Sequence, residues 1–402
     1  MADTQATPWL TLIGWGESGI GALSAASRAA LDEAEVVFGA ARHLRLLPDL
    51  KGEVRCWPVP FADGIPQLLA ERGRRVVMLV SGDPFCFGAG TTITRYLARE
   101  EWHAFPAPST FGLAAARLGW ALEKTVCLGL HAAPLQRARP HMQPGQRLLI
   151  LVRDGQSVGM LAQLISRWGF GRSQLHLLEA LDGARERWRQ GMAEYTVPPD
   201  IQAPVIVGVE VDGDGPAIPM SSGWPDHFFE HDGQLTKQPI RALTLSALAP
   251  QAGQCLWDIG AGSGAIAIEW LARHHLTQAV AFEQSSERAA RARRNALALG
   301  QDRLHVVEGR APLTLDDQPL PDTVFIGGGV SEALLNWLWT HLAEGTRVVA
   351  NAVSLESEAL LSHWQRHNGG ELLRFDWAKA ETMGPRRGWK ARYPIVQWQT
   401  WR

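Results

Sequence analysis

One stretch of the sequence, residues 255–273, constrains the fold more than any other and reads CLWDIGAGSGAIAIEWLAR. Residues 255–259 predict a buried strand, the glycines that follow predict a turn, and the apolar spacing beyond them predicts an amphipathic helix. The turn is Gly260-x-Gly262-x-Gly264, led by Asp258. Because this spacing differs from the Gly-x-Gly-x-x-Gly fingerprint that seats a pyrophosphate, we expect the turn to hold a nucleoside.

Length and composition indicate more than one globular domain. The chain has 402 residues, whereas single cores stop growing at roughly 250–300 residues. The formal net charge of −2 gives no general attraction for nucleic acid or anionic membranes. The sequence has no CxxC pair and no apolar run of the ~18 residues needed to span a bilayer, and residues 1–8 lack the basic start of a signal peptide. We therefore expect a cytoplasmic protein that binds neither nucleic acid nor membrane.

The first half of the chain, residues 1–211, contains three loops that follow predicted strands. Two of them are glycine-rich and come after the apolar residues 9–13 and 76–80, and the third is proline-rich and precedes a helix predicted at 111–119. Loops at the carboxyl ends of strands are where open α/β sheets bind ligands. The candidate ligand-binding residues in these loops are Gly14, Gly82, Asp83, Gly88, Ser109 and Thr110. For Ser109 or Thr110, a helix N-cap is the alternative role.

These loops resemble those of the tetrapyrrole methylase family, which read GxGPG followed by LT, then GDPxxxG, then PGxSS. The present chain matches at Gly14, Gly16, Leu23-Ser24, Gly82-Asp83-Pro84, Gly88, Pro106 and Ser109-Thr110. It departs from the pattern at Glu17, Ser18 and Ala107. The resemblance implies a two-lobed α/β fold with S-adenosyl-L-methionine bound between the lobes. The second lobe would contain strands at 147–152, 175–178 and 205–209 and a helix at 158–168.

A linker predicted at residues 212–233 leads to the second half, residues 234–402. Beyond the glycine turn, strands are expected at 278–282, 304–308, 323–326 and 346–350, with helices between them. Two last strands, 372–378 and 393–401, flank the basic stretch GPRRGWKAR without a helix between them, which predicts a hairpin. The outline resembles the Rossmann-like sheet of class I methyltransferases, closed by an antiparallel hairpin.

This second resemblance implies a second S-adenosyl-L-methionine site. Asp258 would lie near the amino acid end of the cofactor, and Glu283, at the end of the next strand, would accept hydrogen bonds from the ribose hydroxyls. The stretch Gly309-Arg310-Ala311 would border the adenine. Gly327, Gly328 and Gly329 would form an open floor beside the sulfonium, as a large flat substrate needs.

A substrate with many carboxylates requires cations at the site itself. We expect Lys237, Arg241, Arg386 and Arg387 to bind these carboxylates, although a solvated hairpin tip explains the last two equally well. His227 and His231 have helical ligand spacing but no third ligand, so no metal site is expected.

Together the halves resemble the methyltransferases of corrin synthesis, including a small member that also decarboxylates. The resemblance implies methylation of the meso carbons 5 and 15 of a reduced tetrapyrrole, with loss of carbon dioxide from the ring C acetate. The first half would serve carbon 5, and the second half carbon 15 and the decarboxylation. The sequence identifies no residue that carries the proton, so the catalytic residues stay unassigned. Self-association through the second half is expected. The alternatives are an RNA or other small-molecule methyltransferase, or a cofactor-binding scaffold with one inactive domain.

Overall fold

The computed structural model describes residues 8–402, and two compact units are present in it. The first unit contains the described residues up to Ala133 together with His141–Pro216, and the second contains Pro134–Pro140 together with Ala217–Arg402. Residues 1–7 lie outside the described residues, and with them most of the N-terminal stretch in which no signal peptide is expected. In residues 8–402, no helix has both the length and the apolar character that crossing a membrane requires.

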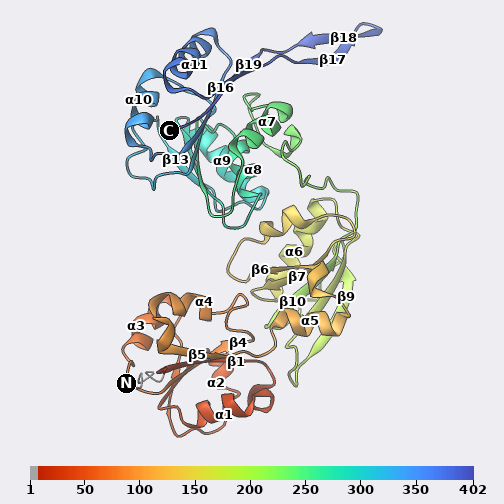
Figure 1. Ribbon diagram of the computed structural model, residues 1–402. Helices are drawn as coiled ribbons and strands as arrows, with labels where there is room; N and C mark the ends of the chain where they lie inside the picture. Colours follow the sequence, from red (N-terminus) through yellow and green to blue (C-terminus); the bar gives the residue numbers. More distant parts are fainter. Residues whose placement is uncertain (1–7) are drawn as a thin grey trace. The chain divides into compact units, whose positions relative to one another are not determined.

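The first lobe of the first unit is a parallel five-stranded sheet in the order β3-β2-β4-β1-β5. Alternating strand residues form two cores: Leu12, Phe38 and Met78 belong to one, and Ile13, Val37 and Leu79 to the other. The helices α3 and α4 cover one face of the sheet and α1 and α2 the other (Figure 1). The elements are β1 (Leu10–Trp15), α1 (Ala25–Asp32), β2 (Val36–Gly39), α2 (Ala41–Leu44), β3 (Glu53–Cys56), α3 (Gly64–Leu69), β4 (Val76–Ser81), α4 (Gly90–Ile93) and β5 (Trp102–Phe105).

The second lobe is a mixed sheet in the order β6-β7-β10-β8-β9. Only the β6–β7 pair is parallel; the other neighbours run antiparallel. Helix α5 packs on β10, and its Phe111 and Ala114 share a core with Leu149 and Ile206 of the sheet. The elements are α5 (Thr110–Leu118), β6 (Thr125–Gly129), β7 (Arg147–Val152), α6 (Gly155–Arg167), β8 (Gln174–Glu179), β9 (Arg187–Met192) and β10 (Val205–Glu210).

The second unit is built on a seven-stranded sheet in the order β13-β12-β11-β14-β15-β19-β16. The first five strands in this order are parallel, and β19 runs antiparallel to both of its neighbours. The elements are α7 (Gln238–Leu248), β11 (Cys255–Ile259), α8 (Ala265–Leu271), β12 (Gln278–Glu283), α9 (Ser286–Ala298), β13 (His305–Glu308), β14 (Thr323–Ile326), α10 (Glu332–His341), β15 (Arg347–Ala352), α11 (Leu355–Asn368), β16 (Glu371–Phe375) and β19 (Ile395–Trp401).

The alternation of apolar residues along β11 and its neighbours explains the layers of this unit. Leu256 and Phe325 belong to a core with α7, α8 and α9, whereas Trp257 and Ile326 belong to a core with α10 and α11. Because both faces are covered, the central strands are apolar throughout. The predicted α/β class, with a two-lobed first half and a Rossmann-like second half, is confirmed.

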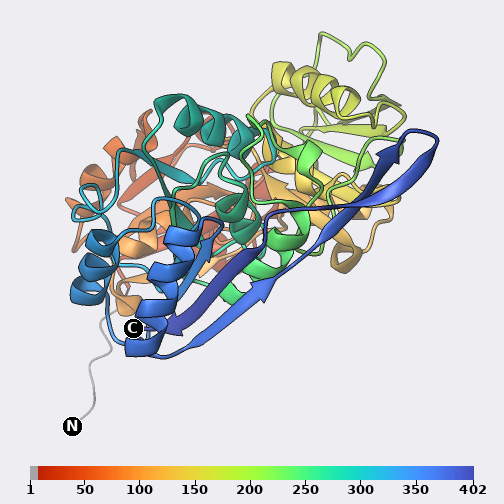
Figure 2. The same cartoon turned by 90° about the horizontal axis from the view of Figure 1, so that it is seen from above.

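The basic stretch between the last two sheet strands is not the loop that the sequence indicated. It forms a separate antiparallel hairpin of β17 (Ala378–Met383) and β18 (Arg386–Ala391), in which Met383 faces Arg386 across a two-residue turn. Gly384 opens this turn with φ +58°, as two-residue hairpin turns favour. The hairpin extends away from the sheet of its own unit in both views (Figures 1 and 2).

Candidate functional site

The carboxyl ends of β13, β12, β11 and β14 meet at one edge of the seven-stranded sheet. The register aligns Ile259 with Phe282 on one side and Ile326 on the other, and Glu283 with Glu308. The residues that follow these strands line one cavity of about 1120 Å³. The sheet order reverses between β11 and β14, and such a switch point is where open α/β sheets bind ligands.

Asp258 lies at the bottom of this cavity with a side chain that is only 1% exposed. Its Oδ2 accepts a hydrogen bond from the N–H of Ala267 in α8 (3.1 Å). Its Oδ1 is buried and has no partner among the described residues. Burial raises the pKa of Asp258 to about 7, and the nearby Glu283 acts in the same direction, whereas the Ala267 N–H opposes it. The site is therefore prepared for a cation or donor group that would replace the proton.

Glu283 ends β12 and turns its carboxylate toward the glycine turn. Its Oε2 accepts a hydrogen bond from the N–H of Gly262 (2.9 Å), and its Oε1 accepts one from the N–H of Ser285 (2.9 Å). These bonds fix the carboxylate, and each oxygen retains a lone pair for a ligand. The structure thus brings Glu283 to the cavity, as the sequence indicated.

The glycine turn and the glycine floor lie against each other. Gly260 has φ +71°, and a Cβ atom added to it would lie 2.7 Å from the carbonyl oxygen of Gly328. A side chain at position 260 would therefore both strain the backbone and close the gap between the ends of β11 and β14. The further glycines and neighbours that line the same cavity are Gly262, Gly309, Arg310, Ala311, Gly327 and Gly329. Gly264 follows the turn as the N-cap of α8.

Of the two cations predicted near α7, only Lys237 lines the cavity. Arg241 is 0% exposed, and its Nε donates to Glu269 (2.6 Å) while its Nη2 donates to Asp226 (3.1 Å). The same guanidinium stacks over the Phe229 ring (4.9 Å). The expectation that Arg241 faces the cavity is wrong, because its side chain is buried and its guanidinium holds Glu269 and Asp226 instead.

The expectation that Arg386 and Arg387 face the cavity is also wrong. Both are exposed, lie at the turn end of the β17–β18 hairpin and do not line the cavity. The base of the hairpin contributes instead, through Trp377, Arg392 and Tyr393. The length of the β17–β18 ladder decides which residues of this segment return to the sheet, so the base of the hairpin and not its turn borders the cavity.

The three loops predicted to form the N-terminal site converge in the first unit. A Cβ atom added to Gly14 would lie 2.2 Å from the carbonyl oxygen of Gly82 and 2.3 Å from the amide nitrogen of Ala107. Each of the three positions belongs to a different predicted loop, so the absence of a side chain at Gly14 permits their contact. Gly82 and Thr110 line a cavity between the two lobes, together with Trp15 and Pro108.

The remaining predicted residues of this site have structural partners. The Oγ of Ser109 accepts a hydrogen bond from the N–H of Gly112 (3.0 Å) and caps α5, which is the alternative role considered for it. The Oδ1 of Asp83 accepts one from the N–H of Phe85 (2.8 Å). A Cβ atom added to Gly88 would lie 2.6 Å from the carbonyl oxygen of Pro84. None of these three residues lines the cavity.

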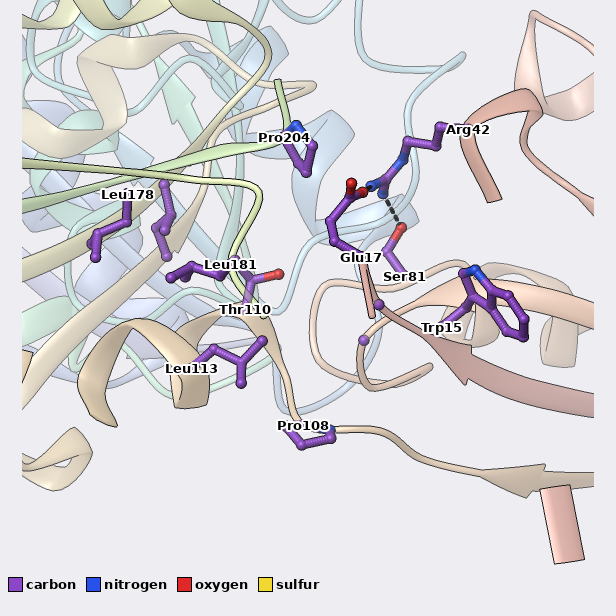
Figure 3. Close-up of a pocket in the computed structure, with 13 residues that line it drawn as sticks. Trp15, Glu17, Arg42, Ser81, Pro108, Thr110, Leu113, Leu178, Leu181 and Pro204 are labelled. Carbon is purple, nitrogen blue, oxygen red and sulfur yellow. Dashed lines mark hydrogen bonds and ion pairs between the residues drawn. The ribbon is translucent and has the colours of Figure 1, made fainter. Parts of the chain in front are cut away.

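A charged cluster that the sequence did not reveal occupies one side of the N-terminal cavity. Glu17 accepts a hydrogen bond from Arg42 (3.1 Å), and Arg42 also donates to the Ser81 hydroxyl (2.5 Å). Figure 3 shows the Glu17 and Arg42 head groups turned toward each other, with Leu113 and Leu178 across the cavity. The only sequence signal was Glu17 itself, at a position where the family pattern has proline. Among residues 8–402, no group of three or more His, Cys, Asp or Glu side chains is placed to hold a metal ion.

Comparisons with known proteins cover both units. The family model for tetrapyrrole (corrin/porphyrin) methylases matches residues 10–169, and the model for the precorrin methyltransferase domain matches residues 227–402. A precorrin-6Y C(5,15)-methyltransferase (decarboxylating) from a Sinorhizobium species is 45% identical over 98% of this chain and 96% of its own length. A protein of the same name from Mycobacterium tuberculosis is 38% identical over 97% and 98%, respectively.

Among solved structures, the C-terminal domain of precorrin-6Y C5,15-methyltransferase from Rhodobacter capsulatus is 48% identical, with a TM-score of 0.45, covering 46% of this chain and all of that domain. The identity to the curated relatives extends through both units rather than through one shared domain. This chain therefore belongs to the precorrin-6Y C(5,15)-methyltransferase (decarboxylating) family and is a methyltransferase of cobalamin biosynthesis.

Proposed function

We propose that the chain methylates carbons 5 and 15 of precorrin-6B and releases the carboxyl group of the ring C acetate as carbon dioxide, which gives precorrin-8. S-adenosyl-L-methionine donates both methyl groups. Residues 1–211 serve carbon 5, residues 212–233 join the two halves, and residues 234–402 serve carbon 15 and the decarboxylation. The observation that supports this proposal is that one chain of this family contains two separate cavities, one between two lobes and one at a sheet edge.

The residues of the sheet-edge cavity fit S-adenosyl-L-methionine. The buried, unpartnered Oδ1 of Asp258 suits the ammonium group of the methionine part, and Glu283 retains acceptors for two hydroxyls of the ribose. The gap beside Gly260 and Gly328 leaves the backbone open to a ligand. When bound, the cofactor supplies an electrophilic methyl group on a positively charged sulfur.

The chain's own part in the reaction is to bind the methyl donor and the tetrapyrrole, to orient them toward each other and to exclude water. A meso carbon of a reduced tetrapyrrole is an enamine-like nucleophile, so no enzyme nucleophile is required once donor and acceptor are aligned. The cavity of about 1120 Å³ exceeds the roughly 300–1,000 Å³ of ordinary small-molecule pockets. This size supports the simultaneous binding of a cofactor and a large flat substrate, with Gly327, Gly328 and Gly329 beneath them.

The cavity is lined by Lys237, Arg310 and Arg392 and by the rings of Trp377 and Tyr393, which suit such a substrate. Lys237 donates to the carbonyl oxygen of Gly233 (3.2 Å), and in the described chain no carboxylate pairs with Lys237 or Arg310. Arg392 is held by Glu381 at the base of the hairpin. We assign substrate carboxylates to these cations, and contact with the macrocycle to Trp377 and to Tyr393, whose side chain is 81% exposed.

Two further assignments belong to this proposal. The four cysteines are unpaired, which fits the reducing cytoplasm. The β17–β18 hairpin carries Met383 and Trp389, which are 66% and 80% exposed, and it supports self-association through the C-terminal half.

The test of the function is the mass of the product formed by the full-length protein from precorrin-6B and S-adenosyl-L-methionine. We expect two added methyl groups and one lost carbon dioxide. A tetrapyrrole that gains methyl groups without losing carbon dioxide would contradict the decarboxylating role. Methylation of RNA in place of the tetrapyrrole would contradict the substrate class.

A further inference from the structure

The N-terminal cleft is bridged by ion pairs that join its two lobes. Arg42, on α2 of the first lobe, donates to Oε1 of Glu17 (3.1 Å). Arg185, in the loop after β8 of the second lobe, donates to Oε2 of the same carboxylate (3.1 Å). Glu17 is only 12% exposed, although Arg185 is 59% exposed. One partly buried carboxylate thus receives a guanidinium from each lobe.

The charges of this bridge do not balance. Among the described residues, Glu17 is the only acidic residue that forms an ion pair with Arg42 or Arg185. Their other partners are neutral: Arg42 donates to the Ser81 hydroxyl (2.5 Å), and Arg185 donates to the side-chain oxygen of Gln202 (3.2 Å). His43 behind Ser81 adds no charge at neutral pH, because burial lowers its pKa to about 4. Two cations therefore share one anion, which leaves an excess positive charge where the two lobes meet.

The loop that carries Arg185 is held in a fixed conformation. Ala180 and Asp182 both have positive φ values, 45° and 64°, which non-glycine residues rarely adopt. Glu186 accepts a hydrogen bond from the Asp182 N–H (2.6 Å) and is itself held by Arg117 (2.6 Å). Strain that persists in this way is typical of sites that position a ligand contact.

This loop also lies directly against the first lobe, since a Cβ atom added to Gly183 would lie 2.6 Å from the Cβ of Glu17. The bridge leaves little room beside it. The cavity that Glu17 and Arg42 line has a volume of about 50 Å³, far below the roughly 300–1,000 Å³ of small-molecule pockets. A ligand of tetrapyrrole size requires the two lobes to separate here, and separation would break one of the two Glu17 ion pairs. A ligand carboxylate could then replace Glu17 on the released guanidinium through the same kind of charge-assisted hydrogen bond.

We propose that Arg42 and Arg185 form the carboxylate-binding site for the tetrapyrrole in the N-terminal cleft, and that Glu17 occupies it as an internal carboxylate until the substrate displaces it. This assignment rests on the proposed function, because it concerns substrate recognition for carbon 5. The anion is a substrate carboxylate rather than the cofactor carboxylate, since the latter travels with its own ammonium group and leaves an excess cation unpaired.

The experiment compares Arg185→Gln, Arg42→Gln and Glu17→Gln in the full-length protein. The readout is the KM and kcat for the methyl addition that is not coupled to carbon dioxide loss, together with cofactor affinity. The other methylation, which is coupled to the loss of carbon dioxide, is measured with the same protein variants as an internal control. Arg172→Gln is a matched control, because Arg172 belongs to the same lobe as Arg185 and pairs with Asp212 and Asp214 rather than with Glu17.

We expect Arg185→Gln and Arg42→Gln to raise the KM roughly tenfold with cofactor affinity unchanged, as loss of a charge-assisted bond to a carboxylate predicts. Glu17→Gln is expected to lower the KM, because the competing internal carboxylate is gone, and Arg172→Gln is expected to have no effect. Arg185 is largely exposed, so its variant keeps the test valid if Arg42→Gln does not fold.

An unchanged KM in Arg185→Gln would overturn the inference, as would a rise in KM for Glu17→Gln equal to that for the arginine variants. Loss of cofactor affinity instead of substrate affinity would assign the arginines to the cofactor and overturn it as well. If the unmodified protein adds no uncoupled methyl group, the proposed function itself fails, and the two failures are thereby distinguished.

Discussion

Replacement of Asp258 by Asn should remove a pH dependence of cofactor binding. Burial raises the pKa of Asp258 to about 7 from an ordinary 3.8, so the carboxyl group is mostly protonated at pH 6. A bound ammonium group favours the ionised form, so the cofactor binds the deprotonated protein more tightly. Affinity for the C-terminal site should therefore rise as the pH rises through 7, and binding below that pH should release a proton.

The size of the effect follows from the ionised fraction of Asp258. With a pKa of about 7, this fraction is about one tenth at pH 6 and about three quarters at pH 7.5. If only the ionised form binds the cation, Kd falls roughly eightfold over this interval, which corresponds to about 1.2 kcal/mol of binding free energy. Asp258→Asn keeps the shape and the Ala267 hydrogen bond acceptor but cannot ionise, so its weaker binding should be independent of pH.

Isothermal titration calorimetry in buffers of different ionisation enthalpy measures both quantities, the affinity and the protons released. The N-terminal site is the same in both proteins, so the difference between them isolates the C-terminal site. The assignment of Asp258 to the cofactor cation would be refuted if the cofactor affinity of the unmodified protein did not change between pH 6 and 7.5. It would also be refuted if the affinity of Asp258→Asn changed with pH by the same amount.

Four other substitutions have separable outcomes. Gly260→Val should abolish cofactor binding at the C-terminal site, because its Cβ would lie 2.7 Å from the Gly328 carbonyl oxygen, while methylation without decarboxylation persists in a product assay. Arg241→Met should lower the free energy of unfolding by about 3–5 kcal/mol in denaturant titration by leaving Glu269 buried and unpaired, and the substrate KM of the folded protein should not change. Arg386→Ala combined with Arg387→Ala should leave the substrate KM unchanged, and an increase in this KM would show that the hairpin tip contacts the substrate. Trp389→Ser should weaken self-association roughly tenfold or more in sedimentation equilibrium, and an unchanged association constant would exclude the hairpin as the contact.

The positions of Asp258 and Glu283 in the fold could be predicted from sequence because they depend on local signals. The strand that contains Asp258 begins and ends as its apolar pattern indicates, and Glu283 is the last residue of the neighbouring strand. Parallel pairing then places both residues at one edge of the sheet without any further information. The convergence of the three N-terminal loops followed in the same way, from the glycine positions within their motifs.

The errors concern residues whose environment depends on distant parts of the chain. Arg241 has the appearance of a surface cation on a helix, but Glu269 meets it from another helix 28 residues away. No sequence pattern marks Arg42 and Arg185 as partners of Glu17, because they lie 25 and 168 residues away from it, respectively. The length of the hairpin was missed although Gly384-Pro385 marks its turn, since charged strand residues lack the apolar alternation by which strands are predicted.

The central claim is that one chain holds two methyl-transfer sites and that only the C-terminal one is coupled to decarboxylation. The most direct measurement is the product mass from precorrin-6B with full-length Gly14→Val and Gly260→Val variants, each of which closes one site. We expect one added methyl group and one lost carbon dioxide for Gly14→Val, and no loss of carbon dioxide for Gly260→Val. Loss of carbon dioxide in the Gly260→Val reaction would contradict the coupling of decarboxylation to the C-terminal site. Retention of the carboxyl group in the Gly14→Val reaction would contradict it as well.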